Sequence, residues 1–374
     1  MVCVEVSVPQ VGRVDPGFWA GRRVLITGHT GFKGAWLSIW LQSLGAVVTG
    51  LANGVPTEPS LYALARVSES MEGELEIDIR DFDALADGVR RAAPEVVIHM
   101  AAQSIVRRSF VDPRETYETN VIGTVNVLDA VRLADGVRVV VNVTSDKCYE
   151  NREWDWGYRE DDSLGGFDPY SSSKACAELV TAAFRRSFFE ADAAGPRLVS
   201  VRAGNVIGGG DWGEDRLLAD AMRSALSGEP LRVRNPYAVR PWQYVLNPLS
   251  GYLVLAQAVW DSPAFATAWN FGPADEEARS VEWIVERVRQ LWPDKLRWEH
   301  DAGPRPPEAS YLRVDSSRAR ARLEWRPTWN LEDALQRTVA WYEAFAGGAD
   351  VPATTLEQVK EFEAAHADTP SAIH

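Results

Sequence analysis

The sequence has few cysteines, more acidic than basic residues and no long apolar run, and each shortage excludes a class of protein. Cys3, Cys148 and Cys176 have no Cys-x-x-Cys spacing and no histidine cluster beside them, which favours reduced thiols and no structural metal. The formal net charge of −14 argues against nucleic acid and anionic membranes, because both attract basic surfaces. The apolar runs are far shorter than the ~20 residues of a membrane-spanning helix, and no basic segment followed by an apolar core stands at the N-terminus. We therefore expect a cytoplasmic protein without nucleic-acid or membrane partners.

The length of 374 residues and the 46% share of hydrophobic residues suit one large core with a smaller attached domain, or two domains. No internal repeat or low-complexity tract occurs. Short aliphatic runs alternate with helical patterns, which predicts an α/β fold with a doubly wound parallel sheet of the Rossmann type. Ligands of such sheets bind at the carboxyl ends of the strands. The expected strands are 23–26, 47–49, 75–77, 95–100, 137–143 and 197–201.

The texture of the sequence changes near residue 203, where loops rich in glycine, proline and arginine begin. We expect residues 18–202 to form a dinucleotide-binding domain, and residues 203–241 and 263–345 to form a smaller lid domain that binds the substrate. The apolar segment at about 242–262 is expected to return a helix to the first domain. Residues 346–374 are expected to form a peripheral tail.

The segment "TGHTGFKGAW", residues 27–36, contains Gly28, Gly31 and Gly34 in the pattern G-x-x-G-x-x-G. A short aliphatic strand precedes it and an amphipathic helical pattern follows. Glycines between a strand and a helix N-terminus allow backbone N–H groups to approach a phosphate closely. The alternative is an ordinary strand-to-helix turn, and the context favours a loop that holds the phosphates of a dinucleotide.

The segment "DPYSSSKACAELV" places Tyr170 and Lys174 four residues apart, on one face of a helix. A nearby ammonium group and the positive charge of a nicotinamide would lower the pKa of Tyr170, so that it could take a proton from a sugar hydroxyl. By itself this spacing fits any solvated helix surface. It follows the glycine loop and a strand that ends in Thr144 and Ser145, two hydroxyl candidates for binding the sugar oxygen, and this combination favours catalysis.

Longer segments carry a resemblance that spans roughly residues 18–345. They are "TGHTGFKGAWL", "VTSDKCYENREWDWGYRE", "DPYSSSKACAELV", "RAGNVIGGGDW", "RNPYAVRPWQYVLNPLSGYL" and "WNFGP". With these motifs the chain resembles the extended short-chain dehydrogenases/reductases, and among them the sugar nucleotide 4,6-dehydratases. The resemblance is closest to the branch that acts on CDP-glucose.

The resemblance implies a lyase reaction in deoxysugar biosynthesis. Tyr170 would deprotonate the 4-hydroxyl while NAD takes the hydride from carbon 4, water would leave across carbons 5 and 6, and the hydride would return to carbon 6. Similar enzymes mostly carry an Asp-Glu pair after the fifth strand, whereas this chain has Asp146-Lys147, as the CDP-glucose branch does. Asp146 would be the acid, with a raised pKa, and Lys147 the base, with a lowered one. The alternative is a structural ion pair. Ser145 stands where the family usually has Thr.

NAD is expected rather than NADP, because Gly50–Asn53 has no arginine for a 2′-phosphate, although it also lacks a ribose-binding acid. Asn53 is a candidate for a ribose hydroxyl. Asp78 and Ile79 resemble the adenine-binding position of the family, although Asp78 also fits an ordinary loop carboxylate. The expected cofactor residues are Gly28, Gly31, Phe32, Lys33, Gly34, Asn53, Asp78, Ile79, Ala101, Ala102, Gln103, Tyr170 and Lys174.

In so acidic a chain, an anionic substrate needs local cations. Arg240 matches the family position for the diphosphate of the sugar nucleotide, and Asn205 matches another contact. The family tends to have histidines where this chain has Arg305 and Ser310. The expected substrate residues are Asn205, Arg234, Arg240, Arg305, Glu308 and Tyr311, with Trp154 and Trp156 either walling the site or, preferably, packed in a core.

Three rival functions share parts of this pattern. An epimerase of nucleotide sugars needs Tyr170 and Lys174 but no acid for water elimination, so the Asp146-Lys147 pair separates the two. A 4,6-dehydratase for another nucleotide sugar would share the whole pattern. A non-enzymatic NAD-binding regulator would keep the glycine loop without the other motifs. We expect CDP-glucose as the substrate, and a homo-oligomer.

Overall fold

The computed structural model describes residues 12–191, 195–303 and 309–368. Within these residues seven parallel strands form one sheet in the order β11-β6-β5-β4-β1-β2-β3. The chain runs outward from β1 to β2 and β3, then crosses back to β4, so the order reverses between β1 and β4. This confirms the doubly wound parallel sheet. The strands are β1 (Arg23–Thr27), β2 (Val47–Ala52), β3 (Gly73–Glu76), β4 (Val96–His99), β5 (Val139–Val143), β6 (Arg197–Arg202) and β11 (Ala268–Asn270).

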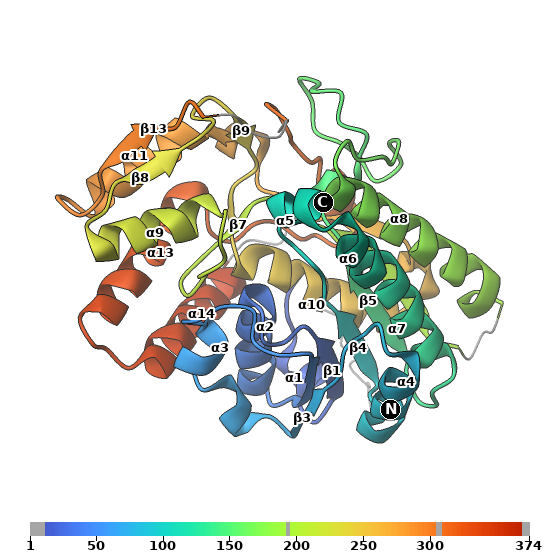
Figure 1. Cartoon of the computed structure of the whole chain (residues 1–374). Coiled ribbons are helices and arrows are strands. Elements are labelled where there is room, and N and C mark those ends of the chain that lie inside the picture. Colours follow the sequence, from blue (N-terminus) through green and yellow to red (C-terminus); the bar gives the residue numbers. More distant parts are fainter. Residues whose placement is uncertain (1–11, 192–194, 304–308, 369–374) are drawn as a thin grey trace, which may run out of the picture.

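The central strands β1, β4 and β5 are nearly continuous aliphatic runs, because both faces of the sheet are covered there. Val24 and Ile26 pack into the cluster that contains α2 (Phe32–Ser43) and α10 (Leu246–Asp261), whereas Leu25 packs into the opposite cluster. Figure 1 shows α4, α7 and α8 on that second side of the sheet. The helices there are α4 (Phe82–Ala92), α5 (Val106–Val111), α6 (Pro113–Tyr117), η2 (Glu118–Ile122), α7 (Gly123–Arg132), α8 (Pro169–Phe184) and η4 (Arg185–Phe189).

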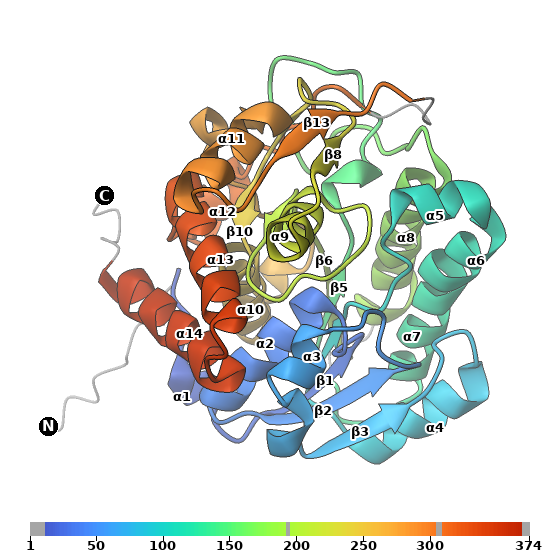
Figure 2. The same ribbon diagram turned by 60° about the vertical axis from the view of Figure 1, so that its left-hand side comes forward.

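The remaining segments form a smaller region beyond the sheet, built from two-stranded pairs and helices. In it β7 pairs with β10, β9 with β12 and β8 with β13. Figure 2 shows α9, β8, β13 and α11 gathered above the strands of the large sheet. The elements are β7 (Val206–Ile207), α9 (Leu217–Ser227), β8 (Leu231–Val233), β9 (Val239–Arg240), β10 (Gln243–Tyr244), β12 (Arg279–Ser280), α11 (Val281–Leu291), β13 (Trp298–His300), α12 (Ser317–Arg322) and α13 (Leu331–Ala346).

Short helical elements complete the chain. They are α1 (Pro16–Trp19), α3 (Leu61–Leu64), η1 (Val67–Ser70), η3 (Asp146–Cys148), η5 (Pro263–Phe265) and η6 (Asp275–Glu277). Across the described residues, no helix, short or long, combines the length and apolar character that a membrane span requires.

One short strand lies elsewhere than the sequence predicts. The segment 263–345 is expected to belong to the lid, but its residues Ala268–Asn270 form β11, which pairs in parallel with β6 at the edge of the large sheet. Trp269 is fully buried there. A strand of three residues is too short to show a period, so only the folded chain reveals that it extends the sheet.

The C-terminal segment also differs from the expected peripheral tail. Residues Val351–Asp368 form the helix α14, and Phe362 is fully buried. The Phe362 ring lies 5.5 Å from the Trp40 ring of α2 and 5.0 Å from the Trp329 ring, centroid to centroid. The polar composition hides a buried stripe at helical spacing, which packs this helix onto the core. The stripe contains Val351, Thr355, Val359, Phe362 and His366.

Candidate active site

The glycine loop joins β1 to α2 next to the end of β4, where the strand order reverses. Gly28 has a φ of +76°, and a Cβ atom added to it would lie 2.7 Å from the backbone nitrogen of Ala101. A Cβ atom on Gly34 would lie 2.2 Å from the carbonyl oxygen of Gly28. Both positions therefore require glycine. Gly31 is the N-cap of α2, so the loop presents a helix N-terminus at the position where dinucleotide phosphates bind in such sheets.

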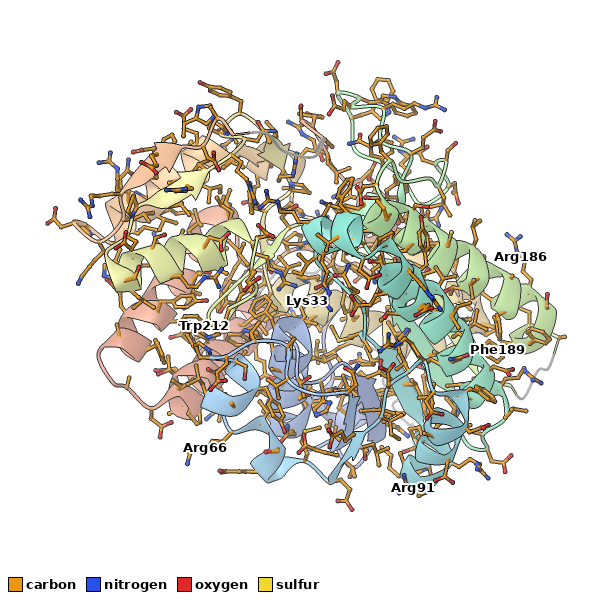
Figure 3. The ribbon with its side chains drawn as sticks, in the orientation of Figure 1. Lys33, Arg66, Arg91, Arg186, Phe189 and Trp212 are labelled. Atoms are coloured by element: carbon orange, nitrogen blue, oxygen red, sulfur yellow. The ribbon has the colours of Figure 1, made fainter. Side chains whose placement is uncertain are left out.

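The first turn of α2 carries Phe32 and Lys33, which are both half-buried. Lys33 lies in the middle of the molecule (Figure 3), with its Nζ atom 5.8 Å from the centre of the Tyr252 ring. Burial and the nearby charges of Lys174 and Arg216 lower the pKa of Lys33 to about 8. The glycine loop and the Tyr170-Lys174 helix, found as separate motifs, therefore meet at one site.

The residues expected at the adenosine end lie together. The side chain of the exposed Asn53 donates a hydrogen bond to Asp78 at 3.0 Å. Arg80 forms an ion pair with Asp78 at 2.6 Å, and its hydrogen bonds hold the pKa of Asp78 at about 2. The buried Ile79 accepts a hydrogen bond from Asn126 through its carbonyl oxygen at 2.9 Å. Sequence reasoning missed Arg80, which directly follows the segment that resembles the family.

The segment after β4 is fixed by hydrogen bonds on both sides. The backbone N–H of Ala101 donates to Thr27 at 3.2 Å, and Ala102 is half-buried beside it. The amide side chain of Gln103 donates to Thr116 at 2.9 Å, so it holds this loop rather than pointing freely into the site. Asn120 donates to the carbonyl oxygen of Gln103 and to Ser173 of α8, which ties the loop to the helix of Tyr170 and Lys174.

The N-terminus of α8 positions Tyr170 and Lys174. Asp168 caps the helix by accepting a hydrogen bond from the backbone of Ser171, so Tyr170 lies in the first turn and Lys174 one turn later. Both side chains are buried. Burial raises the pKa of Tyr170 to about 12, and a hydrogen bond with Ser145 only partly opposes this. The protein's own groups therefore shift this pKa upward, because burial outweighs the neighbouring charges, and the expected lowering requires the positive charge of the nicotinamide as well.

Burial shifts the pKa of Lys174 in the opposite direction from that of Tyr170. Burial lowers the pKa of Lys174 to about 8, and the negative charge of Glu178, one turn further along α8, opposes that shift. Burial disfavours the charged form of both residues. The Lys174 ammonium group therefore loses its proton more easily, and the Tyr170 phenol loses its proton less easily.

The Asp146-Lys147 pair follows β5 in the short turn η3. Ser145 caps this turn: its hydroxyl accepts a hydrogen bond from the backbone of Lys147 at 3.2 Å and donates one to Asp146 at 3.0 Å. Burial raises the pKa of Asp146, and the charge of Lys147 opposes the shift. The Oδ2 atom of Asp146 is buried without a hydrogen-bond partner among the described residues. A raised pKa is what a general acid at this position requires.

The two hydroxyl candidates point in different directions. Thr144 donates a hydrogen bond to Glu178 at 2.5 Å and is directed into the interior. Ser145 bonds with Tyr170 and Asp146 instead. Only the hydroxyl of Ser145 therefore lies among the groups expected to act on the sugar.

Three of the expected substrate residues lie close together in the smaller region. Arg240 of β9 is buried, donates to the carbonyl oxygen of Ala309, and acts through its charge on Asp146. Tyr311 forms a bridge with Val239, next to Arg240. The carbonyl oxygen of Asn205 accepts a hydrogen bond from the backbone of Gln243 at 3.0 Å, three residues beyond Arg240.

Of the other expected substrate residues, Arg234 is paired with a carboxylate of the smaller region. Arg234 forms an ion pair with Asp215 at 2.7 Å, and Arg107 binds the same carboxylate at 3.0 Å. Arg305 and Glu308 lie outside the described residues.

Sequence reasoning missed Arg216, which no motif marks. Its charge acts on both Tyr170 and Lys33, and its guanidinium donates to Asp211 and Ser104, each at 2.9 Å. Its position becomes visible only when the loop before α9 folds over the site.

The two tryptophans have different environments. Trp154 stacks on Tyr158 with ring centroids 5.5 Å apart, as core packing predicts, whereas Trp156 is 61% exposed and does not fit that expectation.

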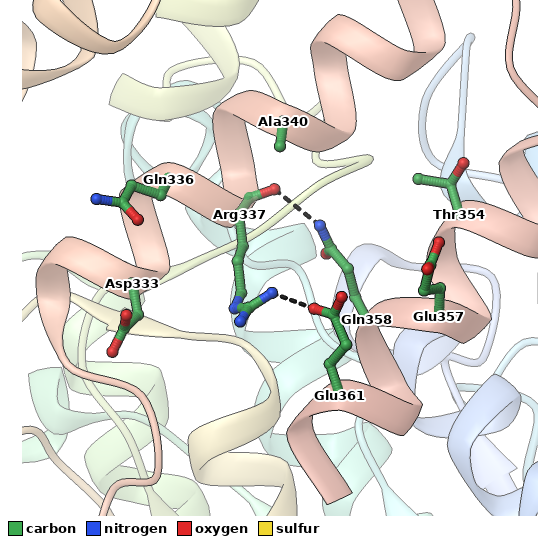
Figure 4. Close-up of a pocket in the computed structure, with 8 residues that line it drawn as sticks. All are labelled: Asp333, Gln336, Arg337, Ala340, Thr354, Glu357, Gln358 and Glu361. Carbon is green, nitrogen blue, oxygen red and sulfur yellow. Dashed lines mark hydrogen bonds and ion pairs between the residues drawn. The ribbon is translucent and has the colours of Figure 1, made fainter. Parts of the chain in front are cut away.

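A separate hollow of about 370 Å³ lies between α13 and α14 (Figure 4). Arg337 pairs with Glu361 across it, and Gln358 donates to the carbonyl oxygen of Arg337 at 2.9 Å. None of the expected site residues lines this hollow. Its lining residues are Asp333, Gln336, Arg337, Ala340, Thr354, Glu357, Gln358 and Glu361.

The fold and the glycine loop define a nucleotide-binding protein of the Rossmann class. A family model described as GDP-mannose 4,6 dehydratase matches residues 25–338, and the chain belongs to this family. This confirms the resemblance to the sugar nucleotide 4,6-dehydratases.

Curated relatives agree with the family. A CDP-glucose 4,6-dehydratase of Salmonella typhimurium is 50% identical over 356 residues, which cover 94% of this chain and 99% of that protein. A dTDP-glucose 4,6-dehydratase of Xanthomonas campestris pv. campestris is 27% identical over 342 residues, covering 85% of this chain and 92% of the relative.

Solved structures share the fold. An epimerase from Methanothermobacter thermautotrophicus superimposes with a TM-score of 0.76 at 22% identity, covering 92% of this chain and 96% of the other. A UDP-glucose 4-epimerase of Thermus thermophilus, solved with NAD, has a TM-score of 0.73 at 24% identity, covering 86% of this chain and 99% of the other. At these identities the likeness concerns the architecture.

Proposed function

We propose that this protein is a CDP-glucose 4,6-dehydratase, which converts CDP-glucose to CDP-4-keto-6-deoxyglucose. The observation that carries the proposal is the hydroxyl group of Ser145, which bonds with both Tyr170 and Asp146. Tyr170, proposed for sugar oxidation, and Asp146, proposed for water elimination, therefore both contact the hydroxyl group of Ser145. The relative with 50% identity supports CDP-glucose as the substrate.

The residues at the switch point of the sheet fit NAD. Gly28 and Gly34 let the glycine loop pack tightly against the backbone of Ala101 and onto itself, and the loop leads into the N-terminus of α2, where Gly31 is the N-cap. Asn53 and Asp78 suit the ribose and adenine end, where the charge of Arg80 is already matched by Asp78 and offers little to a 2′-phosphate. Lys33 and Lys174 add positive charge along the site. When bound, NAD takes a hydride from carbon 4 and returns it to carbon 6.

Removal of the proton from the 4-hydroxyl is assigned to Tyr170. Ser145 orients the 4-oxygen, and Lys174 binds the cofactor from the same face of α8. Because burial raises the pKa of Tyr170 to about 12, proton removal depends on positive charge near the phenol, and Arg216 contributes to it.

Elimination is assigned to Asp146 and Lys147. Burial raises the pKa of Asp146, which favours the protonated form that can donate a proton to the departing 6-oxygen. Lys147 takes the proton from carbon 5, which is acidic next to the 4-keto group. An epimerase requires no such acid, and this pair is what favours a dehydratase although the solved relatives of similar fold include epimerases.

The diphosphate is assigned to Arg240, whose buried guanidinium is a planar group with several N–H donors, two of which bond to the carbonyl oxygens of Val239 and Ala309. Asn205, Arg234, Arg305, Glu308 and Tyr311 complete the proposed substrate residues. In domain terms, residues 18–202 and the returning segment 242–262 bind the dinucleotide. Residues 203–241 and 263–345 bind the sugar nucleotide, apart from β11. A cytoplasmic location and a homo-oligomeric state also belong to this proposal.

A substrate panel tests the function. The purified protein is incubated separately with CDP-, dTDP-, UDP- and GDP-glucose, and the 4-keto product is measured. We expect the highest kcat/KM with CDP-glucose. A preference for another base would reassign the substrate, and an epimerised sugar without a 4-keto product would make the protein an epimerase.

A further inference from the structure

A carboxylate below the site takes part in no step assigned so far. Glu178 lies on α8 four residues beyond Lys174, and its side chain is 3% exposed. It accepts hydrogen bonds from the hydroxyl of Thr144 at 2.5 Å and from that of Ser200 at 2.7 Å. Arg202 donates to it at 2.7 Å. Both oxygens of this carboxylate are thus used in contacts with β5 and β6.

The network continues from the arginine. Arg202 also donates to the hydroxyl of Tyr149 at 2.7 Å, and Tyr149 donates to Asn270 at 2.7 Å. Its members come from α8, from the carboxyl ends of β5 and β6, from β11, and from Tyr149, which directly follows η3. The segments that carry Ser145, Asp146, Tyr170 and Lys174 therefore meet at one buried ion pair.

Stability alone does not explain why the charged pair of Glu178 and Arg202 is buried. Burial alone would raise the pKa of Glu178, but the charge of Arg202 outweighs it and the pKa is lowered. A buried ion pair can often be replaced by apolar side chains of similar volume at little cost in stability. Buried polar networks whose groups are paired instead favour one arrangement of the elements that they join, and in this network the Nε atom of Arg202 is the buried group left without a partner among the described residues.

Thr144 immediately precedes Ser145, and Glu178 and Tyr170 are eight residues apart on one helix, about two turns. The helix thus holds the catalytic turn at two points, through Glu178 with Thr144 and through Tyr170 with Ser145. We propose that Glu178 is a positioning residue, which sets the end of β5 against α8 so that Ser145 and Asp146 meet Tyr170. This rests on the roles assigned above, and Glu178 itself touches no reacting atom.

The test changes the partner rather than the carboxylate, so that Arg202 keeps its counter-charge. Thr144→Val removes the hydroxyl and keeps the shape, and Thr144→Ser restores the donor. We expect Thr144→Val to slow single-turnover reduction of the cofactor by about tenfold to 100-fold, because small misplacements of reacting groups have effects of that size. Substrate affinity should stay within about twofold, and Thr144→Ser should recover most of the rate.

Ser200→Ala is the matched control, because it removes a hydrogen bond to the same carboxylate on the side of β6. We expect it to lower the melting temperature by about as much as Thr144→Val and to leave the rate within about twofold. Equal rate losses in the two variants would overturn the proposal, because the carboxylate would then serve folding only. An unchanged rate in Thr144→Val would also overturn it. The assay uses whichever nucleotide sugar the wild-type protein oxidises, so the substrate assignment can fail independently.

Discussion

Asp146 and Tyr170 share one neighbour, the hydroxyl group of Ser145. It donates to the Asp146 carboxyl group at 3.0 Å and forms a hydrogen bond with the Tyr170 side chain. Burial raises the pKa of both residues, so both resist ionisation in the folded protein. In the proposed mechanism, this shift favours the protonated Asp146 that elimination needs, and it opposes the removal of the Tyr170 proton that oxidation needs. Ser145 is therefore the residue through which the two steps influence one another.

Replacing Ser145 should slow oxidation and change its pH dependence. The hydrogen bond lowers the pKa of Tyr170, so Ser145→Ala should raise that pKa and move the rise in rate to higher pH. We expect about a 100-fold loss near neutral pH, similar to the loss of one hydrogen bond at a developing charge. The measurement is the absorbance of the reduced cofactor in rapid mixing across pH. Ser145→Thr, which keeps the hydroxyl, should restore the rate, and an unshifted profile in Ser145→Ala would contradict this role.

Replacing Lys147 should separate the two half-reactions. If Lys147 is the base at carbon 5, Lys147→Met retains oxidation at carbon 4 and loses exchange of the carbon 5 proton with solvent deuterium by about 100-fold or more. Mass spectrometry measures the exchange, and absorbance measures the reduced cofactor. A structural ion pair predicts a different result, with a lower melting temperature and both steps impaired together, because Asp146 loses its partner.

Replacing Arg240 should affect the substrate and not the cofactor. Arg240→Lys keeps the positive charge and loses the planar fork, so KM for CDP-glucose should rise by about tenfold while the affinity for NAD is unchanged. Steady-state kinetics and a fluorescence titration with NAD measure the two effects. Arg287→Lys is the comparison, since Arg287 lies outside the proposed substrate residues and its guanidinium is paired with Glu332. If the KM stays unchanged in Arg240→Lys, the diphosphate binds elsewhere.

Truncating Phe362 should destabilise the whole protein. The side chain is fully buried between Trp40 and Trp329, and Phe362→Ala should lower the free energy of unfolding by about 3–5 kcal/mol. Denaturant unfolding measures this loss. Glu357→Ala, at an exposed position of the same helix, should change stability by less than about 0.5 kcal/mol. A similar small change in Phe362→Ala would restore the view of this segment as a peripheral tail.

The sequence could predict features that are local in the chain. Gly28 and Gly34 are recognisable from their spacing between a strand and a helical pattern, and their backbone geometry explains why glycine is required. The helix of Tyr170 and Lys174 is indicated by its helical pattern after the fifth strand, and the structure adds the Asp168 cap. The first six strands follow from aliphatic runs between helical patterns. These signals are contained within about ten to 20 residues each, and they need no knowledge of tertiary contacts.

Features that depend on tertiary contacts could not be predicted in this way. The short strand β11 becomes part of the sheet only beside β6. Arg216 reaches the site through a loop whose course no motif indicates. The direction of the Tyr170 pKa shift depends on how deeply the phenol is buried, and spacing along a helix says nothing about that.

The contact between Phe362 and Trp40 also gives the cofactor loop a distant support. Trp40 is on α2, the helix that begins at the glycine loop, and it lies about 12 Å from that first turn along a rigid rod. A bulky fusion or a deletion that shifts α14 would tilt this rod. The glycine loop at the other end of α2 would move with it. A change in α14, far from the proposed active site, would therefore be measured as weaker binding of the cofactor.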